Sequence, residues 1–141
     1  TMKIAVVGSR DFFLIYDYHK NEYVIDEEKG IFVNETLVNE FSDGHVLVSG
    51  GAKGVDICAE QTIDEWNTAT FNVTKIPNKW KKKIFKPDWN RYGKRAGFLR
   101  NELIVAEADK VIAFWDGTSK GTKHSIDLAI KAGKPLDIYV R

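Results

Sequence analysis

The sequence predicts a single α/β domain built on a doubly wound parallel sheet of about five strands. Short apolar runs rich in β-branched residues alternate with longer segments of helical periodicity, and this alternation favours right-handed crossovers and a sheet covered on both faces. The chain has 141 residues, of which 43% are hydrophobic and 29% are charged. This composition suits one globular domain, and no repeat or low-complexity segment divides the chain.

The individual strands and helices are expected from the spacing of apolar residues. Continuous β-branched runs predict buried strands, and apolar residues spaced three and four apart predict helix faces. Strands are expected at residues 3–7, 45–48, 71–76, 110–115 and 135–140, and helices at residues 31–41, 55–66, 96–107 and 122–132. Residues 11–30 show no clean period and are expected to form a long loop with room for a helical turn.

The net charge of +1 conceals an uneven distribution. Between Lys75 and Arg100 there are ten Lys or Arg residues and one acid, Asp88, so this segment carries +9 and the rest of the chain carries −8. A concentrated positive potential attracts anionic ligands. We therefore expect an anion to approach the protein on the side of this segment.

The single cysteine, Cys58, excludes an internal disulfide framework. No Cys/His cluster has the spacing of a zinc site, so no metal is predicted. The apolar run at residues 3–7 is too short for a signal peptide, and no stretch approaches the ~20 apolar residues of a membrane helix. These observations predict a soluble, cytoplasmic protein without membrane contact.

A glycine loop, residues 49–56, joins the second predicted strand to the following helix. Its sequence is Ser-Gly-Gly-Ala-Lys-Gly-Val-Asp. Glycines allow the backbone to turn sharply and approach a ligand, and the helix N-terminus offers free N–H groups to a phosphate. A tight strand-to-helix turn would also explain the glycines. The loop matches neither G-x-x-x-x-G-K-[ST] nor G-x-G-x-x-G, so neither an ATPase nor a dinucleotide cofactor is predicted.

Three polar segments follow predicted strands and should meet at one edge of the sheet, namely residues 8–10, 49–54 and 115–122. In open parallel sheets, ligands bind beyond the carboxyl ends of the strands where the strand order reverses. We therefore expect a site for a phosphate-bearing nucleotide or nucleotide derivative. The candidate ligand-binding residues are Gly8, Ser9, Arg10, Ser49, Gly50, Gly51, Ala52, Lys53, Gly54, Asp56, Trp89, Arg100, Asn101, Trp115, Ser119, Gly121 and Thr122.

Several of these side chains have two possible roles. Arg10 and Arg100 could clamp a phosphate with paired N–H donors or remain solvated charges. Thr122 could bind a ligand oxygen or cap the helix that follows it. Trp89 and Trp115 could stack on a base or pack in the core. The residues alone leave these alternatives open.

Taken together, these motifs resemble the SLOG superfamily, named for the SMF/DprA and LOG (lonely guy) proteins, and within it the YspA-like branch of small bacterial and phage proteins. The resemblance extends in order over nearly the whole chain. It includes Gly8-Ser9-Arg10, Ser49 to Asp56, Asp88-Trp89, Tyr92-Gly93-Lys94, Ala96-Gly97, Arg100-Asn101, Ala108-Asp109, Phe114-Trp115 and Ser119-Lys120-Gly121-Thr122. The resemblance implies a Rossmann-like fold, a site for nucleotides or their derivatives, and a homodimer as in many relatives.

The same resemblance raises an enzymatic alternative. LOG enzymes cleave the N-glycosidic bond of nucleoside 5′-monophosphates with a Pro-Gly-Gly-x-Gly-Thr-x-x-Glu segment. Here Gly121 and Thr122 match its Gly-Thr, which places Ser125 where the glutamate is expected. The missing acid favours a binding protein, acting as a sensor or by sequestering its ligand, over a hydrolase. The candidate catalytic residues, if hydrolysis occurs, are Arg100, Asp56 and Asp116.

Single-stranded DNA binding is a third possibility, because DprA relatives bind it. Residues 79–86, Lys-Trp-Lys-Lys-Lys-Ile-Phe-Lys, interleave basic and aromatic residues as strand-binding grooves do. A solvated loop that supplies positive potential near the ligand site explains the same segment. Since the whole chain lacks a strongly basic balance, nucleic acid is not an expected partner.

Overall fold

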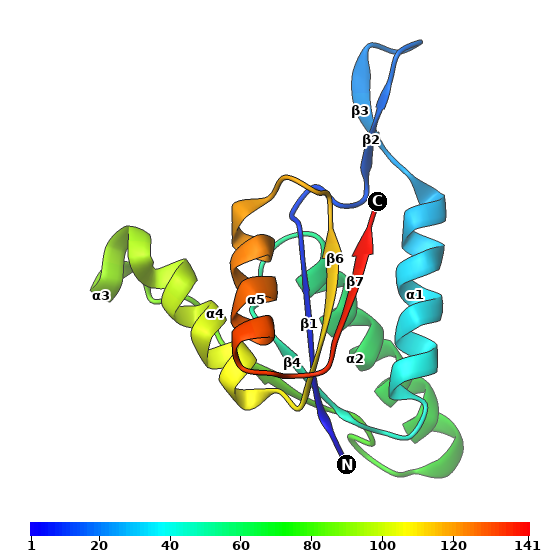
Figure 1. Cartoon of the computed structure of the whole chain (residues 1–141). Helices are drawn as coiled ribbons and strands as arrows, with labels where there is room; N and C mark the ends of the chain where they lie inside the picture. Colours follow the sequence, from blue (N-terminus) through cyan, green and yellow to red (C-terminus); the bar gives the residue numbers. More distant parts are fainter.

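The computed structural model describes all residues, 1–141, and contains one five-stranded parallel sheet in the order β5-β4-β1-β6-β7 (Figure 1). The strands are β1 (Lys3–Gly8), β4 (Val46–Ser49), β5 (Lys81–Ile84), β6 (Lys110–Trp115) and β7 (Leu136–Val140). The central strand β1 pairs in parallel with β4 on one side and β6 on the other. The predicted single-domain, Rossmann-like α/β fold is therefore confirmed.

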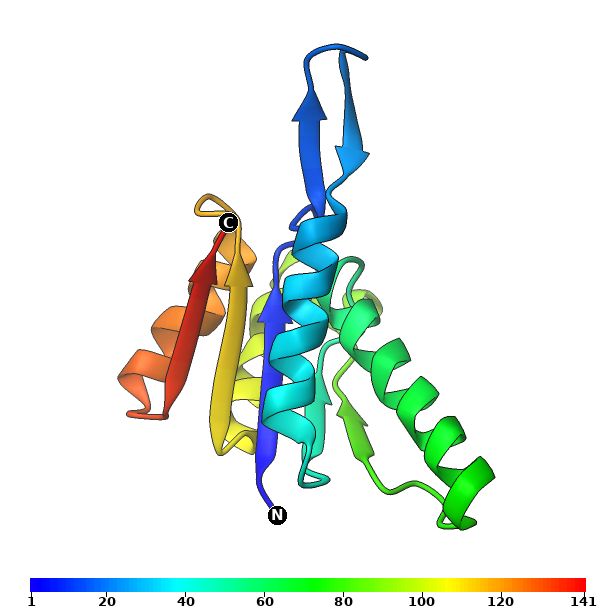
Figure 2. The same cartoon turned by 90° about the vertical axis from the view of Figure 1, so that its right-hand side faces the viewer.

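Four long helices cover the two faces of the sheet, as Figures 1 and 2 show. They are α1 (Glu27–Phe41), α2 (Val55–Thr74), α4 (Ala96–Glu107) and α5 (Lys120–Lys131). Successive side chains of a strand point to opposite faces. Ile4 and Val6 of β1 accordingly belong to the core under α1 and α2, whereas Ala5 and Val7 belong to the core under α4 and α5. Strand β1 is therefore buried on both faces at the centre of the sheet.

Helix α1 begins four residues earlier than the apolar spacing indicated. Asp26 is its N-cap, and a carboxylate oxygen of Asp26 accepts a hydrogen bond from the backbone N–H of Glu28 at 3.0 Å. Glu27 and Glu28 place negative charge in the first turn, where it interacts favourably with the helix dipole. Gly30 therefore lies inside the helix and does not end the preceding loop.

The strand predicted at residues 71–76 is wrong. Helix α2 continues through this segment to Thr74 and ends at Lys75, whose φ of 62° is left-handed and whose N–H donates to the Phe71 carbonyl at 2.8 Å. The third strand of the parallel sheet, counted along the chain, is instead β5, which lies in the basic segment between Lys75 and Arg100. Because β5 pairs only with β4 at the sheet edge, its lysine side chains reach solvent and no apolar pattern is required.

The loop expected at residues 11–30 is also partly wrong, since it contains an antiparallel hairpin. Strands β2 (Leu14–Asp17) and β3 (Glu22–Ile25) pair with each other and stand out from the molecule (Figure 2). Tyr16 lies opposite Tyr23, with ring centroids 5.2 Å apart. The hairpin covers no core, so its sequence lacks the alternation of apolar and polar residues that identifies a half-buried strand.

A short arm connects β5 to α4. It consists of helix α3 (Trp89–Tyr92) and a 3-10 turn (Gly93–Arg95), and Asp88 caps it by accepting from the Arg91 N–H at 3.1 Å. The arm protrudes on the α4 side of the molecule (Figure 1). None of the helices is long and apolar enough to cross a membrane.

Candidate functional site

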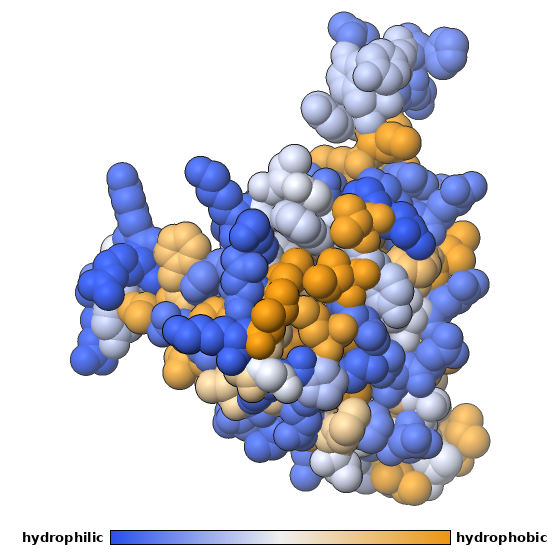
Figure 3. Space-filling model, viewed as in Figure 1, coloured by the Kyte–Doolittle hydropathy of each residue, from blue (hydrophilic) through white to orange (hydrophobic).

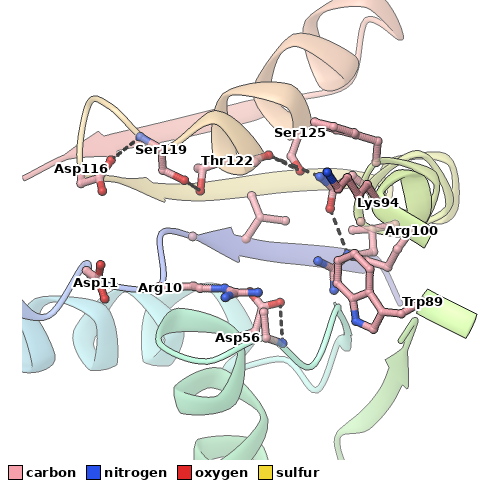
Figure 4. Close-up of a pocket in the computed structure, with 18 residues that line it drawn as sticks. Arg10, Asp11, Asp56, Trp89, Lys94, Arg100, Asp116, Ser119, Thr122 and Ser125 are labelled. Atoms are coloured by element: carbon pink, nitrogen blue, oxygen red, sulfur yellow. Dashed lines mark hydrogen bonds between the residues drawn. The ribbon is translucent and has the colours of Figure 1, made fainter. Parts of the chain in front are cut away.

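A cleft of about 470 Å³ opens at the carboxyl ends of β1 and β6, where the strand order reverses. This is the place at which ligands bind in open α/β sheets, and its volume is within the range of small-molecule sites. Figure 4 shows Asp116, Ser119, Thr122 and Ser125 along one wall, Arg10, Asp11 and Asp56 along the other, and Lys94, Arg100 and Trp89 at one end. Apolar surface comes mainly from Val7, Ala52, Phe98 and Ile104.

The glycine loop lies beside this cleft, but side chains of the protein occupy its backbone donors. Asp56 Oδ2 accepts from the N–H of Gly50 at 3.2 Å and from that of Ala52 at 3.3 Å. Glu60 Oε2 accepts from the Gly51 N–H at 3.1 Å and from the Ser49 hydroxyl at 2.8 Å. Two carboxylates of α2 thus satisfy three of the N–H groups in the glycine loop, whereas the first turn of α2 has no side-chain cap.

Only two of the predicted loop residues line the cleft, namely Ala52 and Asp56. The predicted residues Ser49, Gly50, Gly51, Lys53 and Gly54 do not. Gly54 has a structural role, because its φ is +87° and a Cβ there would stand 2.5 Å from the Arg10 carbonyl oxygen. The glycine allows the end of β1 and the start of α2 to approach closely.

Asp56 is 6% exposed and faces the cleft. Burial raises the pKa of its carboxyl to about 6, although the Ala52 N–H and the Arg100 guanidinium favour the ionised form and limit the rise. A group that titrates near neutral pH in a cleft is a common feature of functional sites. Asp56 is therefore both the anchor of the glycine loop and a titratable group in the cleft.

Arg100 connects the glycine loop to α4. Its Nη1 donates to the Gly50 carbonyl at 2.6 Å, and its Nε donates to Asn101 Oδ1 at 3.0 Å. Burial lowers the pKa of Arg100, the charge of Asp56 opposes this effect, and the charge of Arg10 adds to it. These contacts fix the guanidinium at the cleft wall. They use two of its five N–H groups, and the others can bind an anion.

The N-terminus of α5 opens into the cleft. No side chain caps this helix, and Gly121 and Thr122 of its first turn line the cleft. The Thr122 hydroxyl is buried, 3.4 Å from the hydroxyls of Ser9 and Ser119. Uncapped N–H groups and the helix dipole together favour an anion at this point. Helix α2, after the glycine loop, has no side-chain cap either, but of the two helices only α5 brings consecutive residues of its first turn, Gly121 and Thr122, to the cleft.

Asp116 shapes the loop that leads into α5. Its Oδ1 accepts from the N–H groups of Ser119 at 2.7 Å and Thr118 at 2.9 Å. Burial alone would raise the pKa of Asp116, but these hydrogen bonds outweigh burial and lower the pKa. Trp115 assists from outside the cleft, because its indole N–H donates to the Ser119 carbonyl at 3.0 Å. Trp115 is not among the lining residues, so the cleft does not offer it to a base.

Asn101 joins α4 to the first turn of α5. Its Nδ2 donates to the Gly121 carbonyl at 3.3 Å and lies 3.3 Å from His124 Nδ1. Ser125, at the position where the resemblance expects glutamate, is buried and lines the cleft, with its hydroxyl 3.5 Å from the same carbonyl. The acid expected there is replaced by a neutral hydroxyl inside the site.

The cleft also includes residues that the sequence reasoning did not select as ligand-binding. These are Val7, Asp11, Lys94, Gly97, Phe98, Ile104, Asp116 and Ser125. Helical spacing could have found part of this set, because Gly97 and Ile104 lie four residues before and three residues after the predicted Asn101, on the same face of α4. Asp11 lies in a turn and Lys94 lies in the 3-10 turn Gly93–Arg95, and their positions at the cleft depend on the tertiary fold.

The fold and the cleft define a small Rossmann-like α/β protein with a ligand-sized site at the point where the strand order reverses. The Gene 61 protein of Mycobacterium phage D29 is 40% identical to this chain over 94 residues, which is 66% of this chain and 70% of that protein. The chain belongs to the family of this phage protein. No family model matches the chain. The phage relative fits the resemblance to small bacterial and phage proteins.

Solved structures share the fold at low sequence identity. DprA from Helicobacter pylori is 24% identical with a TM-score of 0.57 over 97% of this chain, and DprA from Streptococcus pneumoniae is 19% identical with a TM-score of 0.59 over 97%. The structure of TM1055 is 20% identical with a TM-score of 0.60, and the match covers 96% of this chain and 72% of that one. This chain spans 64% and 50% of the two DprA chains.

These similarities agree with the fold that the resemblance to the SLOG superfamily implied, since DprA is one of the proteins for which the superfamily is named. The YspA-like branch stays a prediction. The H. pylori structure concerns the single-stranded DNA binding mode of that DprA. That a protein with this fold binds single-stranded DNA argues against the expectation that nucleic acid is not a partner.

Proposed function

We propose that this protein binds a phosphate-bearing nucleotide or nucleotide derivative in the cleft, as a sensor or by sequestering it. The observation behind the proposal is that one cleft of about 470 Å³ combines an uncapped helix N-terminus, a fixed guanidinium and an accessible indole. The first two suit a phosphate and the third suits a base. A nucleotide is the common small molecule that requires both.

The charges of the lining residues support an orientation for the ligand. Arg10, Lys94 and Arg100 supply positive charge, and the α5 N-terminus supplies backbone donors. The phosphate is assigned to the space between Arg100 and the first turn of α5. Trp89, half exposed at the end of the cleft, is then free to stack on the base.

The absence of a free carboxylate in the cleft at the expected position favours binding without turnover. Cleavage of an N-glycosidic bond builds positive charge on the ribose, which a nearby carboxylate stabilises. Ser125 has no charge to offer, and Asp56 and Asp116 already accept backbone hydrogen bonds. The enzymatic alternative rests on Asp56, whose pKa of about 6 would let it exchange a proton near neutral pH.

Thermal unfolding in the presence of a panel of nucleotides, ADP-ribose and cyclic dinucleotides tests the binding proposal. A ligand at 100 times its dissociation constant stabilises by about 2.7 kcal/mol, which corresponds to roughly 5–10 °C for a domain of this size. Trp89→Ala should weaken binding by about 5- to 100-fold through lost stacking. Tyr92→Ala is the matched control, because Tyr92 is similarly exposed and does not line the cleft. No shift with any phosphate-bearing compound would end the proposal.

Chromatography of free base and ribose 5-phosphate after incubation with AMP, GMP, CMP or UMP tests the enzymatic alternative. We expect little release. Turnover that disappears in Arg100→Ala would favour the hydrolase, because contaminating activity would survive that change. Asp56→Asn and Asp116→Asn, made singly, would then identify the carboxylate.

Single-stranded DNA is the second candidate ligand, and the protruding arm favours it. Trp89 and Tyr92 of α3 expose their rings beside Arg91, Lys94 and Arg95. Exposed aromatic rings among cations form the stacking platform of strand-binding proteins. The lysines of β5 suit this role less well, because Lys82 pairs with Asp64 at 2.6 Å and Lys83 pairs with Glu107 at 3.0 Å.

Fluorescence anisotropy with a labelled oligonucleotide distinguishes these surfaces. If DNA binds on the arm, changing Arg91, Lys94 and Arg95 together to Ser should abolish binding and its salt dependence. Changing Lys81, Lys82 and Lys83 to Ser should have a smaller effect. A larger loss of DNA affinity in the Lys81, Lys82 and Lys83 variant than in the arm variant would assign DNA binding to the β5 edge. Weak DNA binding by both variants and by the unmodified protein would leave the small molecule as the ligand.

A further inference from the structure

The hairpin β2–β3 contributes nothing to the core or to the cleft. None of its residues belongs to either core cluster, and none lines the cleft. A two-stranded hairpin is marginally stable by itself in water, and a third strand or a packed surface stabilises it. Figure 3 shows the hairpin standing clear of the remaining surface, with hydrophobic atoms at its base and hydrophilic atoms at its tip. Its strand edges are therefore accessible to a partner.

The backbone hydrogen bonds of the hairpin define which groups point outward. The Asp26 N–H donates to the Phe13 carbonyl at 2.7 Å, so these two residues form a hydrogen-bonded pair. In an antiparallel ladder, such pairs alternate with pairs whose N–H and C=O groups point away from the neighbouring strand. The outward groups therefore belong to Leu14, Tyr16, Tyr23 and Ile25.

The edge of β2 is partly occupied, whereas the edge of β3 is open. The Leu14 N–H donates to the Asp11 carbonyl at 3.0 Å, and the Leu14 carbonyl accepts from Lys29 Nζ at 3.4 Å. No hydrogen bond outside the ladder involves Tyr23 or Ile25, which are 69% and 71% exposed. Strand β3, Glu-Tyr-Val-Ile, contains no lysine, proline or bulge that would oppose further pairing.

The two faces of the hairpin differ in chemistry. Tyr16 and Tyr23 lie opposite each other on one face, next to Ile25. The other face carries Asp17 directly opposite Glu22. Like charges in this position destabilise a pair of strands, and no ion pair of the chain includes either carboxylate. This face is therefore suited to cations that the chain itself does not supply.

The charge around the hairpin restricts the kind of partner. Residues 11–28 contain six Asp or Glu residues and one Lys, so this segment carries −5. Nucleic acid and anionic lipid are therefore unsuited to this surface. A second copy of β3 is also unsuited, because a twofold axis normal to the hairpin would place the carboxylates of both copies on the same face.

We propose that the edge of β3 binds an extended segment of a partner protein, in which apolar and basic residues alternate, as a third strand of the hairpin. Side chains of a strand alternate between its two faces. The apolar residues of the segment thus extend the face of Tyr16 and Tyr23, and the basic residues lie on the face of Asp17 and Glu22. The outward backbone groups of β3 supply affinity, and the two faces supply selectivity.

Fluorescence anisotropy of the full chain with two labelled hexapeptides tests the charge preference. One peptide alternates Val and Arg, and the other alternates Val and Glu. We expect the Arg peptide to bind at least about 5-fold more tightly, because several cross-strand charge pairs change from attractive to repulsive. Glu22→Lys should reduce this ratio by about 3-fold or more, whereas Glu65→Lys, the matched change at an exposed residue of α2, should not. No binding of the Arg peptide, equal binding of both peptides, or equal effects of the two substitutions would overturn the proposal.

A proline substitution tests strand addition itself. Ile25→Pro removes an outward N–H of β3 but no hydrogen bond between β2 and β3, and Ile25→Ala is the matched control that keeps this N–H. Ile25→Pro should bind the Arg peptide about 3- to 10-fold more weakly than Ile25→Ala. Equal affinities of the two variants would refute β3 as the binding edge.

Amide hydrogen exchange of the unmodified protein, followed by NMR, gives a readout that needs no substitution. The Arg peptide should protect the N–H groups of Tyr23 and Ile25, because these point to the added strand. The N–H of Val24 points to β2, so its exchange should change less. A bound peptide that protects neither Tyr23 nor Ile25 would show that it binds elsewhere and would overturn the proposal.

Discussion

Replacing Asp56 with Asn should remove a pH-dependent cost of folding. The pKa of Asp56 rises from 3.8 to about 6 in the folded protein, mainly through burial. Between these values the folded state holds a proton that the unfolded state has lost. The stability associated with this proton is therefore complete below the unfolded pKa and is lost as the pH rises through the folded pKa.

The size of the effect on the free energy of unfolding follows from the shift in the Asp56 pKa. At 1.36 kcal/mol for each pKa unit, holding Asp56 ionised in the fold costs about 3 kcal/mol at pH values above the folded pKa. An asparagine oxygen can still accept from Gly50 and Ala52, and the amide carries no charge to desolvate. The difference in unfolding free energy, unmodified protein minus Asp56→Asn, should therefore fall by about 2.5 kcal/mol between pH 4, just above the unfolded pKa, and pH 8.

Urea denaturation followed by tryptophan fluorescence at a series of pH values measures this difference. The carboxyls of Asp116 and Glu107, whose pKa values are lowered, titrate alike in both proteins and cancel. Asp127→Asn is the matched control, because Asp127 forms only an exposed pair with Lys123 and should change stability by less than about 1 kcal/mol at any pH. A difference for Asp56→Asn that stays constant with pH would refute the buried, ionisable carboxyl.

Three further changes test the structure by unfolding measurements. Lys134→Met should destabilise the fold by about 1.5–3 kcal/mol, because the Lys134 ammonium donates to three carbonyl oxygens at the C-terminal end of α4. Lys131 is exposed, so the control Lys131→Met should have little effect. Gly54→Ala should destabilise the fold by at least about 1–3 kcal/mol, because φ is positive and the new Cβ would lie 2.5 Å from the Arg10 carbonyl oxygen. The control Gly30→Ala lies in α1, where a Cβ meets no atom within 4 Å, and should stabilise by about 0.5–1 kcal/mol. Replacing Leu14–Ile25 with Asn-Gly should leave a folded domain, because the hairpin covers no core and its flanking backbone groups lie 2.7 Å apart. An unfolded hairpin deletion, or equal losses in both members of either pair, would contradict these assignments.

The sequence predicted the elements that bury an apolar face. Residues 96–107 and 110–115 match α4 and β6, because packing on the sheet imposes the helical or strand period on the chain. The strand at residues 3–7 and the polar segments after three strands were also predicted from this pattern. Elements outside the core were not, because the exposed edge strand β5 and the hairpin β2–β3 bury no continuous face.

The sequence also determined that polar segments meet at one edge of the sheet, because parallel strands deliver their carboxyl ends to the same edge. Only the tertiary structure decided how these groups are used. Asp56 and Glu60 of α2 accept from the N–H groups of Gly50, Gly51 and Ala52, and it is the start of α5 that brings Gly121 and Thr122 to the cleft. The tertiary structure also decided the role of Arg100, which donates to the carbonyl of Gly50, 50 residues away in the chain. Periodicity reports burial, whereas hydrogen-bond partners depend on distances that exist only after the chain has folded.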